Sequence, residues 1–518
     1  MTGAEPFYVT TPIYYVNDAL HLGHAYTTVA CDALARFMRL DGRPVHFLTG
    51  TDEHGQKVEK SAQAAGLDPQ TFCDRASQKA RDMTVLMNIS NDDFIRTTEP
   101  RHARSCQALW RAIAARKTPK GRDNIYLGKY AGWYAVRDEA FYGEDELTTG
   151  ADGKKRAPSG AEVDWVEEPS YFFRLSDWAD WLVAHYERRP EAAAPAARRN
   201  EILSFVKGGL HDLSISRTTF TWGIPVPGDE THIMYVWFDA LINYITGVGY
   251  PDIESAAFKT FWPADLHMVG KDIIRFHGVY WPAFLEAGGV APPKRVFAHG
   301  WWTVEGEKMS KSLGNVIPPE ALVDKYGLDP LRYFMLRELP FGSDGDFSHR
   351  AMVNRINGDL ANGLGNLAQR TLTLINRNCD ARVPSPGALT AADEALLDAA
   401  RALLSRLRAD YAEQAFHRAL EALWQVVAEA DRYIDEQKPW ALRKTDAARA
   451  GTVLYVLAEV VRHLATLMQP IVPDAAAKLL DQLAIPPTQR SFAALATALA
   501  ADTVVPKPEG VFPRYVEG

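Results

Sequence analysis

The stretch FYVTTPIYYVNDALHLGH, residues 7–24, decides how the beginning of this chain is expected to fold. Its first part, residues 7–16, is rich in aromatic and β-branched residues, which predicts a buried strand. The last six residues, ALHLGH, stand where this strand gives way to an amphipathic stretch at 24–40, and another β-rich run follows at 45–49. Strands that alternate with helices indicate βαβ units, so we expect an α/β domain with a parallel sheet.

The rest of the chain changes character several times. Its 518 residues exceed what one hydrophobic core usually supports, which predicts two to four domains. Residues 126–165 are rich in Gly, Tyr and charged residues and indicate an inserted surface module. The Ala-, Pro- and Arg-rich stretch 188–201 is typical of a mobile turn or linker. From residue 350 onward, apolar residues recur at steps of three and four, which predicts a helical bundle.

Composition narrows the class of protein. Hydrophobic residues make up 47% and charged residues 24%, as in an ordinary globular protein, and no apolar run reaches the length of about 20 residues that spans a membrane. We therefore expect a cytoplasmic protein without a membrane partner. Cys31, Cys73, Cys106 and Cys379 have no paired spacing, which argues against disulfides and against a zinc knuckle. The net charge of −8 does not indicate nucleic-acid binding, so an RNA partner has to be inferred from sites.

The tetrapeptide HLGH at 21–24 could bind phosphate. Gly23 lets a ligand lie close to the backbone, and the start of a helix offers free N–H groups and a positive dipole end. His21 and His24, three residues apart, would lie on one side of the first turn and could donate hydrogen bonds to phosphoryl oxygens. Taken alone, the motif is equally compatible with histidines that cap the helix or fill the core.

A second motif, GEKMSKSLGN at 306–315, could act on the same phosphates. Lys308 and Lys311 stand three residues apart in a stretch bracketed by glycines and rich in hydroxyl groups. Two ammonium groups on a flexible loop can close over a triphosphate and neutralise its charge in the transition state. A solvated lysine loop explains the motif if it stands alone. Its presence together with HLGH favours a nucleotide site.

Five ordered motifs carry a resemblance to a known family. TTPIYYVNDALHLGHAYTT, FLTGTDEHGQKV, VWFDALINY, VGKDIIRFHGVYWPA and GEKMSKSLGNV closely resemble the methionyl-tRNA synthetases of bacterial type, within the class I aminoacyl-tRNA synthetases. The similarity extends from residue 7 to beyond residue 440. It implies a Rossmann-type parallel-sheet catalytic domain with an inserted module, followed by an all-α anticodon-binding bundle. The expected segments are 1–115 and 226–295 (catalytic), 116–225 (inserted module), 296–349 (stem-contact region with the lysine loop) and 350–518 (bundle).

The resemblance implies roles for single residues. The implied catalytic residues are His21, His24, Lys308 and Lys311. The implied ATP-binding residues are these four together with Gly23, Gly270 and Asp272. Asp52 matches the carboxylate that receives the methionine ammonium group, although a turn-capping Asp also suits its sequence. The positions that match the methionine pocket are Ile13, Tyr15, Asp52, Trp237, Ala240, Leu241, Tyr244, Ile273 and His277. Some relatives have proline where this chain has Leu241, which puts the pocket's shape in question.

The stretch LANGLGNLAQR places Asn362, Asn366 and Arg370 at steps of four, hence on one face of a helix, and Trp440 stands at a proline-marked helix boundary. A polar face beside a buried Trp explains the spacing on its own. The family resemblance instead implies anticodon recognition by these four residues, since amides and a guanidinium can read base edges and an indole can stack on a base.

The resemblance further implies a two-step reaction of L-methionine, ATP with Mg²⁺, and tRNA(Met) with a CAU anticodon, carried out by a monomer. The carboxylate of methionine attacks the α-phosphorus without a general base, because it is already ionised, and the 3′-terminal adenosine then takes the methionyl group. Positioning and charge stabilisation carry such a step.

One departure from the family concerns zinc. Many relatives have Cys-x-x-Cys where this chain has Ala135, Val136, Arg137 and Asp138, and no second cysteine pair follows. Zinc needs about four ligands, so we expect no zinc and no other bound metal. The knuckle is instead expected to be held by its aromatic residues, which are Tyr130, Trp133, Tyr134, Phe141 and Tyr142.

Three alternatives stay open from the sequence. A class I synthetase for another amino acid would share both signatures, although residues 126–225 are too few for an editing domain. A catalytically silent RNA-binding protein descended from a synthetase would have no use for HLGH, KMSKS and Asp52. A small nucleotidyltransferase with an HxGH motif does not need so long a chain or a helical bundle.

Overall fold

The computed structural model describes residues 5–17, 19–138, 140–150, 152–308 and 316–517. The chain divides into two compact units. The first comprises residues 6–20 and 46–299, and the second comprises residues 1–5, 21–45 and 300–518. This division rests on packing contacts, whereas the five expected segments are functional regions. Their boundaries therefore stay predictions.

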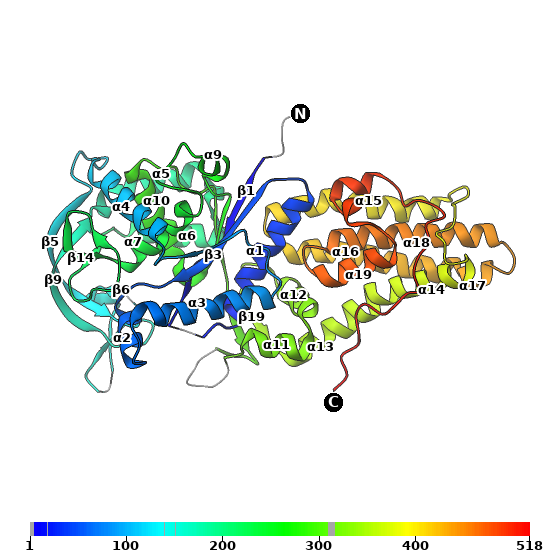
Figure 1. The fold of residues 1–518 in the computed structure, drawn as a ribbon, viewed down its shortest axis with the longest axis horizontal. Coiled ribbons are helices and arrows are strands. Elements are labelled where there is room, and N and C mark those ends of the chain that lie inside the picture. The colour runs from blue at the N-terminus through cyan, green and yellow to red at the C-terminus, as the bar shows by residue number, and fades with distance from the viewer. Residues whose placement is uncertain (1–4, 18, 139, 151, 309–315, 518) are drawn as a thin grey trace. The chain divides into compact units, whose positions relative to one another are not determined.

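The first unit is built on a parallel sheet (Figure 1). Its strand order is β10-β16-β15-β1-β3-β2, and β4 also pairs with β3. The strands are β1 (Phe7–Thr10), β2 (Tyr14–Tyr15), β3 (Val45–Asp52), β4 (Asp93–Arg96), β10 (Ala193–Ala194), β15 (Leu266–Gly270) and β16 (Val296–His299). The pairs β1–β15, β15–β16, β10–β16, β2–β3 and β3–β4 run parallel, which confirms the predicted sheet type.

Two expectations about this sheet are wrong in detail. The predicted strand 7–16 is two strands. The Thr11 N–H still donates to the Leu48 carbonyl oxygen of β3, but Pro12 lacks an N–H for the ladder and interrupts the strand. The predicted linker 188–201 contains β10 at the sheet edge and the start of the helix α6 (Ala196–Lys207). The alanines that form β10 carry no β-strand preference in the sequence, so the pairing with β16 comes from the tertiary fold.

Helices and an antiparallel module complete the first unit. The helices are α2 (Gln56–Ala64), α3 (Pro69–Leu86), α4 (Pro100–Ala114), α5 (Ala179–Arg188), α6, α7 (Val236–Leu241), α8 (Asn243–Thr246), α9 (Ala256–Phe261) and α10 (Trp281–Gly288). In the module, β5 (Ile125–Ala135) pairs with both β9 (Asp164–Phe173) and β6 (Ala140–Tyr142). Smaller ladders join β11 (Leu213–Ser214) to β9, β7 (Thr148–Thr149) to β8 (Lys155–Arg156), and β14 (Asp229–Met234) to β12 (Ser216–Arg217) and β13 (Pro225–Val226).

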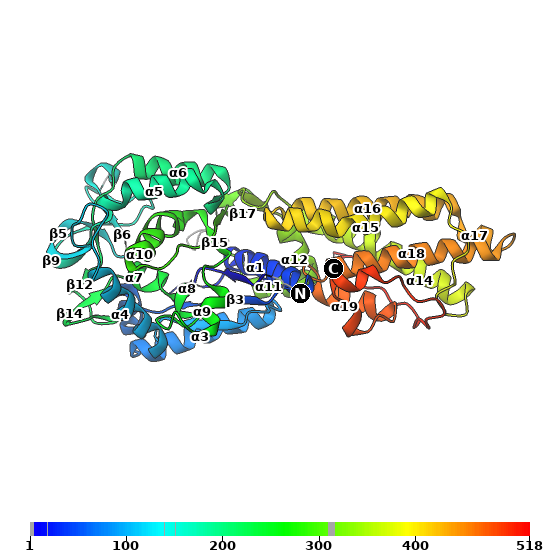
Figure 2. The ribbon, with the colours of Figure 1, turned by 90° about the horizontal axis from the view of Figure 1, so that it is seen from above.

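The second unit is mainly helical, as the sequence predicts. Its long helices lie side by side, and the helix α18 (Ala447–Met468) runs through the middle (Figure 2). The other helices are α1 (Leu22–Leu40), α11 (Pro319–Tyr326), α12 (Leu328–Arg337), α13 (His349–Asn354), α14 (Asn366–Asn378), α15 (Ala391–Ala412), α16 (Phe416–Gln437), α17 (Pro439–Leu442) and α19 (Pro473–Gln482). A small sheet of order β18-β17-β19 joins β17 (Trp302–Val304) to β18 (Glu307–Lys308) and β19 (Gly345–Phe347). By length and composition α18 could cross a membrane, but its whole apolar window is buried in the bundle, as expected of a core helix.

The helix α1, which the sequence places in a βαβ unit, packs within this second unit. Asp32 forms a fully buried ion pair with Arg332 of α12 at 2.6 Å. One turn further on, the ring of Phe37 stacks on Tyr411 of α15 with ring centroids 3.9 Å apart. These contacts fix α1, and with it His21 and His24, to the helical unit.

Candidate active site

The ends of the strands β2 and β3 bring Tyr15 and Asp52 together. The two residues are register partners in the parallel pair, and the Val16 N–H donates to the Asp52 carbonyl oxygen at 3.4 Å. Asp52 is 5% exposed, and its Oδ1 and the Tyr15 hydroxyl have no hydrogen-bond partner among the described residues. Burial raises the pKa of the Asp52 carboxyl well above its usual value, and the charges of Asp239 and Glu53 act in the same direction. Asp52 Oδ1 can therefore accept a hydrogen bond from a ligand, and a cationic donor would favour the ionised carboxylate.

The residues expected to line a methionine pocket lie in the same unit, around the core that α7 and α8 help to form. Leu241 and Tyr244 are buried core residues, Ala240 is also buried, and the half-buried Ile13, Trp237 and Ile273 pack against this core. The Trp237 ring stacks on Phe276 at 3.7 Å and stands edge-on to His277 at 6.3 Å. The result is a largely apolar, aromatic wall, which suits a thioether side chain.

A hydrogen-bond chain fixes His277 in this wall. Its Nδ1 lies 3.0 Å from the Ile273 carbonyl oxygen, which can only accept, and its Nε2 lies 2.7 Å from the Tyr244 hydroxyl. Burial lowers the pKa of His277 to about 4. The ring is therefore neutral at pH 7, with its proton on Nδ1, and Nε2 accepts from Tyr244. The tyrosine ring is thereby held in one orientation.

Gly270 and Asp272, the expected ribose ligands, occupy the carboxyl end of β15. Gly270 ends the strand and precedes a short 3₁₀-helix that carries Asp272. A Cβ atom built on Gly270 would lie 2.5 Å from a carboxylate oxygen of Asp272, so the glycine leaves room for the carboxylate in this position. This edge of a parallel sheet is where open α/β folds bind ligands.

The HLGH motif forms the N-terminus of α1, and its histidines cap the helix. The Gly23 N–H donates to His21 Nδ1 at 3.0 Å, and the His21 N–H donates to His24 Nδ1 at 3.2 Å. The two rings lie 4.1 Å apart between centroids. Because both Nδ1 atoms accept, each neutral ring carries its proton on Nε2, which is a donor suited to an anion. From the sequence, capping of the helix and phosphate binding were alternatives. They are compatible, because capping uses Nδ1 and phosphate binding would use Nε2–H.

Gly23 has a structural role in addition to the one expected. A Cβ atom at this position would lie 2.9 Å from Cε1 and 3.1 Å from Nδ1 of His21. The glycine thus leaves room for the imidazole of its own motif, and its predicted role beside a bound ligand stays a prediction. Of the two expected catalytic lysines, Lys308 lies in β18 without a described side chain, and Lys311 lies outside the described residues.

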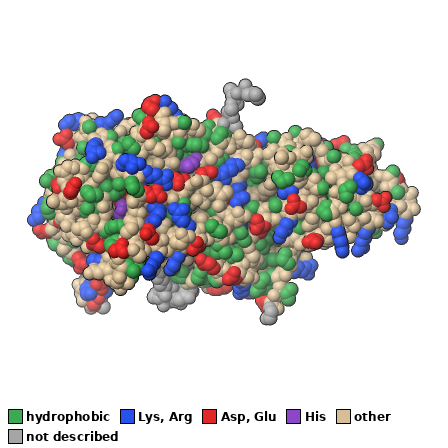
Figure 3. Space-filling model, in the orientation of Figure 1, with side chains coloured by type: hydrophobic (Ala, Val, Ile, Leu, Met, Phe, Trp, Pro, Cys, Tyr) green, Lys and Arg blue, Asp and Glu red, His purple; other side chains and the backbone are tan. Residues whose placement is uncertain are grey.

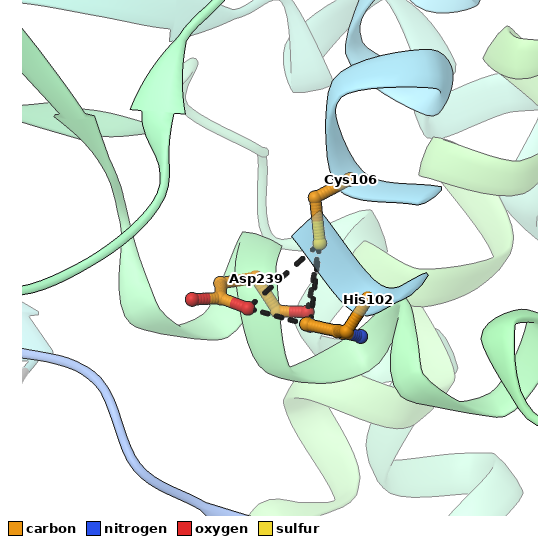
Figure 4. A group of neighbouring side chains, drawn as sticks. All are labelled: His102, Cys106 and Asp239. Carbon is orange, nitrogen blue, oxygen red and sulfur yellow. Dashed lines mark hydrogen bonds and ion pairs between the residues drawn. The ribbon is translucent and has the colours of Figure 1, made fainter. Parts of the chain in front are cut away.

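A buried cluster that the sequence did not reveal lies beside the pocket. Asp239 of α7 accepts from His102 Nε2 of α4 at 2.7 Å and from His54 Nδ1 at 2.6 Å, and Cys106 Sγ lies 3.2 Å from His102 Nε2 (Figure 4). In the described part of the chain, His102, Cys106 and Asp239 are the one group of three potential metal ligands within 4.8 Å of one another. The 2.7 Å contact is a hydrogen bond, since two ligands on one tetrahedral zinc stand about 3.3 Å apart. The sequence contains one hint of this cluster: His54 and Asp239 lie in two of the motifs that carry the family resemblance, GTDEHG and VWFDAL.

The expected anticodon residues lie in the helical unit, but not all on one α-helix face. Asn366 and Arg370 belong to α14, whereas Asn362 lies in a π-helix, Arg355–Gly365, whose Gly363 has non-helical dihedrals (φ −83°, ψ −106°). The expectation of a single face is therefore wrong. Asn362 Oδ1 accepts from Arg514, near the chain end.

Arg370 and Trp440 lie next to each other beside a surface pocket. The Arg370 guanidinium lies 5.8 Å from the Trp440 ring centroid and 2.7 Å from Asp435, and the indole is 42% exposed. The pocket has a volume of about 440 Å³ and is lined by Gln369, Arg370, Thr373, Leu374 and Trp440. Basic side chains gather along this edge of the bundle, near α14 and α17 (Figure 3). The arrangement suits a flat, anionic ligand.

The knuckle is held together in another way than expected. Its buried core consists of Ala135, Ala157, Ala161 and Val163, and among the four expected aromatics whose side chains are described, Trp133 and Tyr142 pack against this core. Tyr130 stacks near Phe172, Tyr134 lies beside Arg217, and the Phe141 side chain lies outside the described residues. Asp138 accepts from the hydroxyls of Ser159 and Tyr142. Neither the buried Ala135 nor the hydrogen-bonded Asp138 can supply a thiolate, so these two positions do not fit a thiolate zinc site.

Comparison with known proteins adds independent evidence. Residues 7–372 match the family of class I tRNA synthetases (M), and residues 383–517 match the anticodon-binding domain of methionyl-tRNA ligase. The chain is 58% identical over 515 residues to a methionine–tRNA ligase of Mesorhizobium japonicum, covering 99% of this chain and 98% of that one. It is 53% identical to a methionine–tRNA ligase of Mycobacterium bovis, with the same coverage.

Among solved structures, Mycobacterium tuberculosis methionyl-tRNA synthetase in complex with methionyl-adenylate matches with a TM-score of 0.95 and 53% identity, covering 99% of this chain and all of that one. The apo form of the same protein matches with a TM-score of 0.90, 50% identity and 99% coverage of both chains. The expected fold class is thus confirmed. The chain belongs to the methionine–tRNA ligases, a family of class I aminoacyl-tRNA synthetases.

Proposed function

We propose that this chain, as a methionine–tRNA ligase, binds methionine through Asp52 and the aromatic wall of the sheet unit, activates it with ATP, and transfers it to tRNA(Met). One observation carries the assignment of the amino-acid site. Asp52 is a buried carboxylate with a raised pKa and an oxygen that lacks a partner among the described residues, beside a tyrosine hydroxyl in the same condition. A buried charge of this kind is costly unless a cation pairs with it, and the ammonium group of an amino acid supplies that cation.

The side chain of methionine is then recognised by packing. The proposed pocket is formed by Ile13, Tyr15, Trp237, Ala240, Leu241, Tyr244, Ile273 and His277. The neutral His277 holds the Tyr244 ring, so that a flexible thioether meets a fixed surface. Sulfur–ring contacts are worth about 0.3–1.5 kcal/mol each, and the remaining affinity comes from apolar burial.

In the first step, a carboxylate oxygen of methionine attacks the α-phosphorus of ATP, the bond to the β-phosphoryl oxygen breaks, and pyrophosphate leaves with the electron pair. His21 and His24 donate Nε2–H bonds to phosphoryl oxygens at the α1 N-terminus, next to Gly23, where the helix dipole also favours anions. Lys308 and Lys311 neutralise the triphosphate of MgATP. Gly270 and Asp272 hold the ribose at the end of β15.

In the second step, the 3′-terminal hydroxyl of tRNA(Met) attacks the carbonyl carbon of methionyl-adenylate, and AMP leaves. The anticodon CAU is recognised in the helical unit by Asn362, Asn366, Arg370 and Trp440. The surface pocket, the exposed indole and the neighbouring basic side chains support this assignment. For a phosphate or base to bind there, it has to compete with Asp435 for Arg370.

We expect a cytoplasmic monomer without a membrane partner, a knuckle that does not bind zinc, and Mg²⁺ only as part of the ATP substrate. The five predicted segments, 1–115, 116–225, 226–295, 296–349 and 350–518, remain our description of the functional domains.

Amino-acid-dependent exchange between pyrophosphate and ATP, followed by charging of tRNA with a CAU anticodon, tests the proposal. We expect exchange with methionine and none with valine, isoleucine or cysteine, and charging that is lost when the anticodon is changed. Replacement of Lys311 by Ala should lower adenylate formation sharply and leave tRNA affinity nearly unchanged. Equal losses in both measurements would mean that the lysine acts in RNA binding.

A further inference from the structure

The carboxylate of Asp239 is the meeting point of three segments of the sheet unit. The residue is fully buried, and each of its oxygens accepts one hydrogen bond from an imidazole, Oδ2 from His54 Nδ1 at 2.6 Å and Oδ1 from His102 Nε2 at 2.7 Å. Burial alone would raise the pKa of Asp239, but the two imidazoles outweigh it and hold the pKa at about 2. The carboxylate is therefore ionised, and both histidine nitrogens must be the donors.

The first contact of Asp239 leads to the proposed ammonium site. His54 lies two residues after Asp52, and the Asp239–His54 pair joins positions 185 residues apart. The indole of Trp222 packs edge-on against the His54 ring at 5.5 Å, and its Nε1 donates to the Glu53 carbonyl oxygen at 2.6 Å. The turn that follows Asp52 is thus held from both sides, by Trp222 and by Asp239.

Asp239 itself belongs to the proposed side-chain pocket. It lies in α7 between Trp237 and the pair Ala240 and Leu241. Because successive residues of a short helix move together, the position of the Asp239 carboxylate fixes the position of these pocket residues relative to His54.

The second contact leads away from methionine. His102 is in α4, and its Nδ1 lies 3.2 Å from the Thr246 hydroxyl of α8. Cys106, one turn further along α4, lies 3.8 Å from the Asp239 carbonyl oxygen (Figure 4). This side of the cluster joins α7 to its supporting helices and does not reach Asp52.

We propose that Asp239 is a positioning residue for methionine, which through His54 sets the distance between the ammonium-binding Asp52 and the side-chain pocket on α7. The inference rests on the proposed role of Asp52. Methionine carries its ammonium group and its thioether at the two ends of a flexible chain, so a pocket can select chain length only if its two ends are held at a fixed separation. A missing or extra methylene is then discriminated by about 10–200-fold.

The two histidines offer a matched pair of variants for the test. His54→Ala and His102→Ala each remove one imidazole from the same buried carboxylate, so both should lower the melting temperature. Only His54→Ala breaks the connection to Asp52. In methionine-dependent pyrophosphate exchange we expect His54→Ala to raise the KM for methionine at least about tenfold, with the KM for ATP within about twofold of the wild type. For His102→Ala we expect the KM for methionine to rise less than about threefold.

A conservative variant keeps the test informative if an alanine variant does not fold. In His54→Asn the side-chain amide nitrogen takes the place of Nδ1, so a donor to Asp239 remains, and the KM for methionine should stay within about threefold of the wild type. His54→Ala should also reduce the preference for methionine over amino acids one methylene shorter or longer by at least about fivefold, whereas His102→Ala should preserve it.

The results separate this inference from the proposed function. Equal rises in the KM for methionine in both alanine variants, or a loss of stability without a change in KM, would mean that Asp239 is structural only. The same holds if the KM values for methionine and ATP rise together. If the wild type shows no methionine-dependent exchange, or if Asp52→Asn leaves the KM for methionine unchanged, the proposed function itself is wrong.

Discussion

Two buried carboxyl groups of the sheet unit, Asp52 at the end of β3 and Asp239 in α7, have pKa values shifted in opposite directions. Asp52 has an oxygen without a partner among the described residues, and burial raises its pKa. Asp239 has an imidazole on each oxygen and a pKa of about 2, although it is buried even more completely. Burial alone therefore does not decide the direction of the pKa shift; the hydrogen-bond partners do. A carboxylate that lacks its cation in the ligand-free protein is suited to bind one, whereas a carboxylate with both oxygens paired is suited to hold other residues.

The largest expected effect is that of Asp52→Asn on activity. The amide has the shape of the carboxyl but no negative charge, so methionine loses a charge-assisted hydrogen bond in a buried site. We expect the KM for methionine in pyrophosphate exchange to rise about 100-fold or more, with a small change in the KM for ATP. Asp265→Asn is the control, because Asp265 carries the same charge in the same unit but pairs with the Tyr8 N–H and with Lys294. An equal rise in the control would show that the effect is not specific to Asp52.

In stability, unlike in activity, the larger effect is expected at Asp239. Asp239→Asn leaves one imidazole N–H facing an amide that cannot accept from both rings, so the free energy of unfolding should fall by about 3 kcal/mol. Asp52→Asn removes a buried carboxyl without a protein cation and should not lower it. Urea denaturation of both variants without ligand measures the difference. If Asp52→Asn is the more destabilised of the two, Asp52 is a structural residue and not a binding one.

A smaller effect is expected in the pH dependence of stability. The folded pKa of Asp52 is raised above its unfolded value, so its contribution is present below the unfolded pKa of about 4 and is lost as pH rises through the folded pKa. The folded pKa of Asp239 is depressed, so its contribution is present above pH 4 and is lost as pH falls towards 2. Melting temperatures of ligand-free wild type and Asp52→Asn at pH 5 and pH 8 give the check. The wild type should lose stability relative to the variant at the higher pH, and saturating methionine should cancel this loss.

The sequence predicts this pair of carboxylates unequally. Asp52 could be found because the segment that carries it is continuous, running from a strand into a turn with a recognisable pattern. The contacts of Asp239 join residues 137 and 185 positions apart, and no local periodicity encodes them. The same limit explains β10, whose alanines are in the sheet only because β16 lies beside them, and the π-helix, which a spacing of four residues cannot distinguish from an α-helix. Strand and helix types, the helix that starts at HLGH, and the helical C-terminal part followed from local pattern alone.

The smallest effect is expected at a third carboxylate, that of Asp138 in the knuckle. Its side chain is 16% exposed and accepts hydrogen bonds from Ser159 and Tyr142. Partly exposed contacts of this kind contribute about 1 kcal/mol or less, and the apolar core around Ala135 remains without them. Asp138→Ala should therefore lower the free energy of unfolding by no more than about 1 kcal/mol, reduce hydrogen-exchange protection within the knuckle only, and leave methionine-dependent exchange within about twofold of the wild type. A chelator that binds zinc but not Mg²⁺ should have no effect on either protein. Loss of activity with that chelator would mean that the enzyme depends on a bound zinc ion, and the expectation of a zinc-free protein would be wrong.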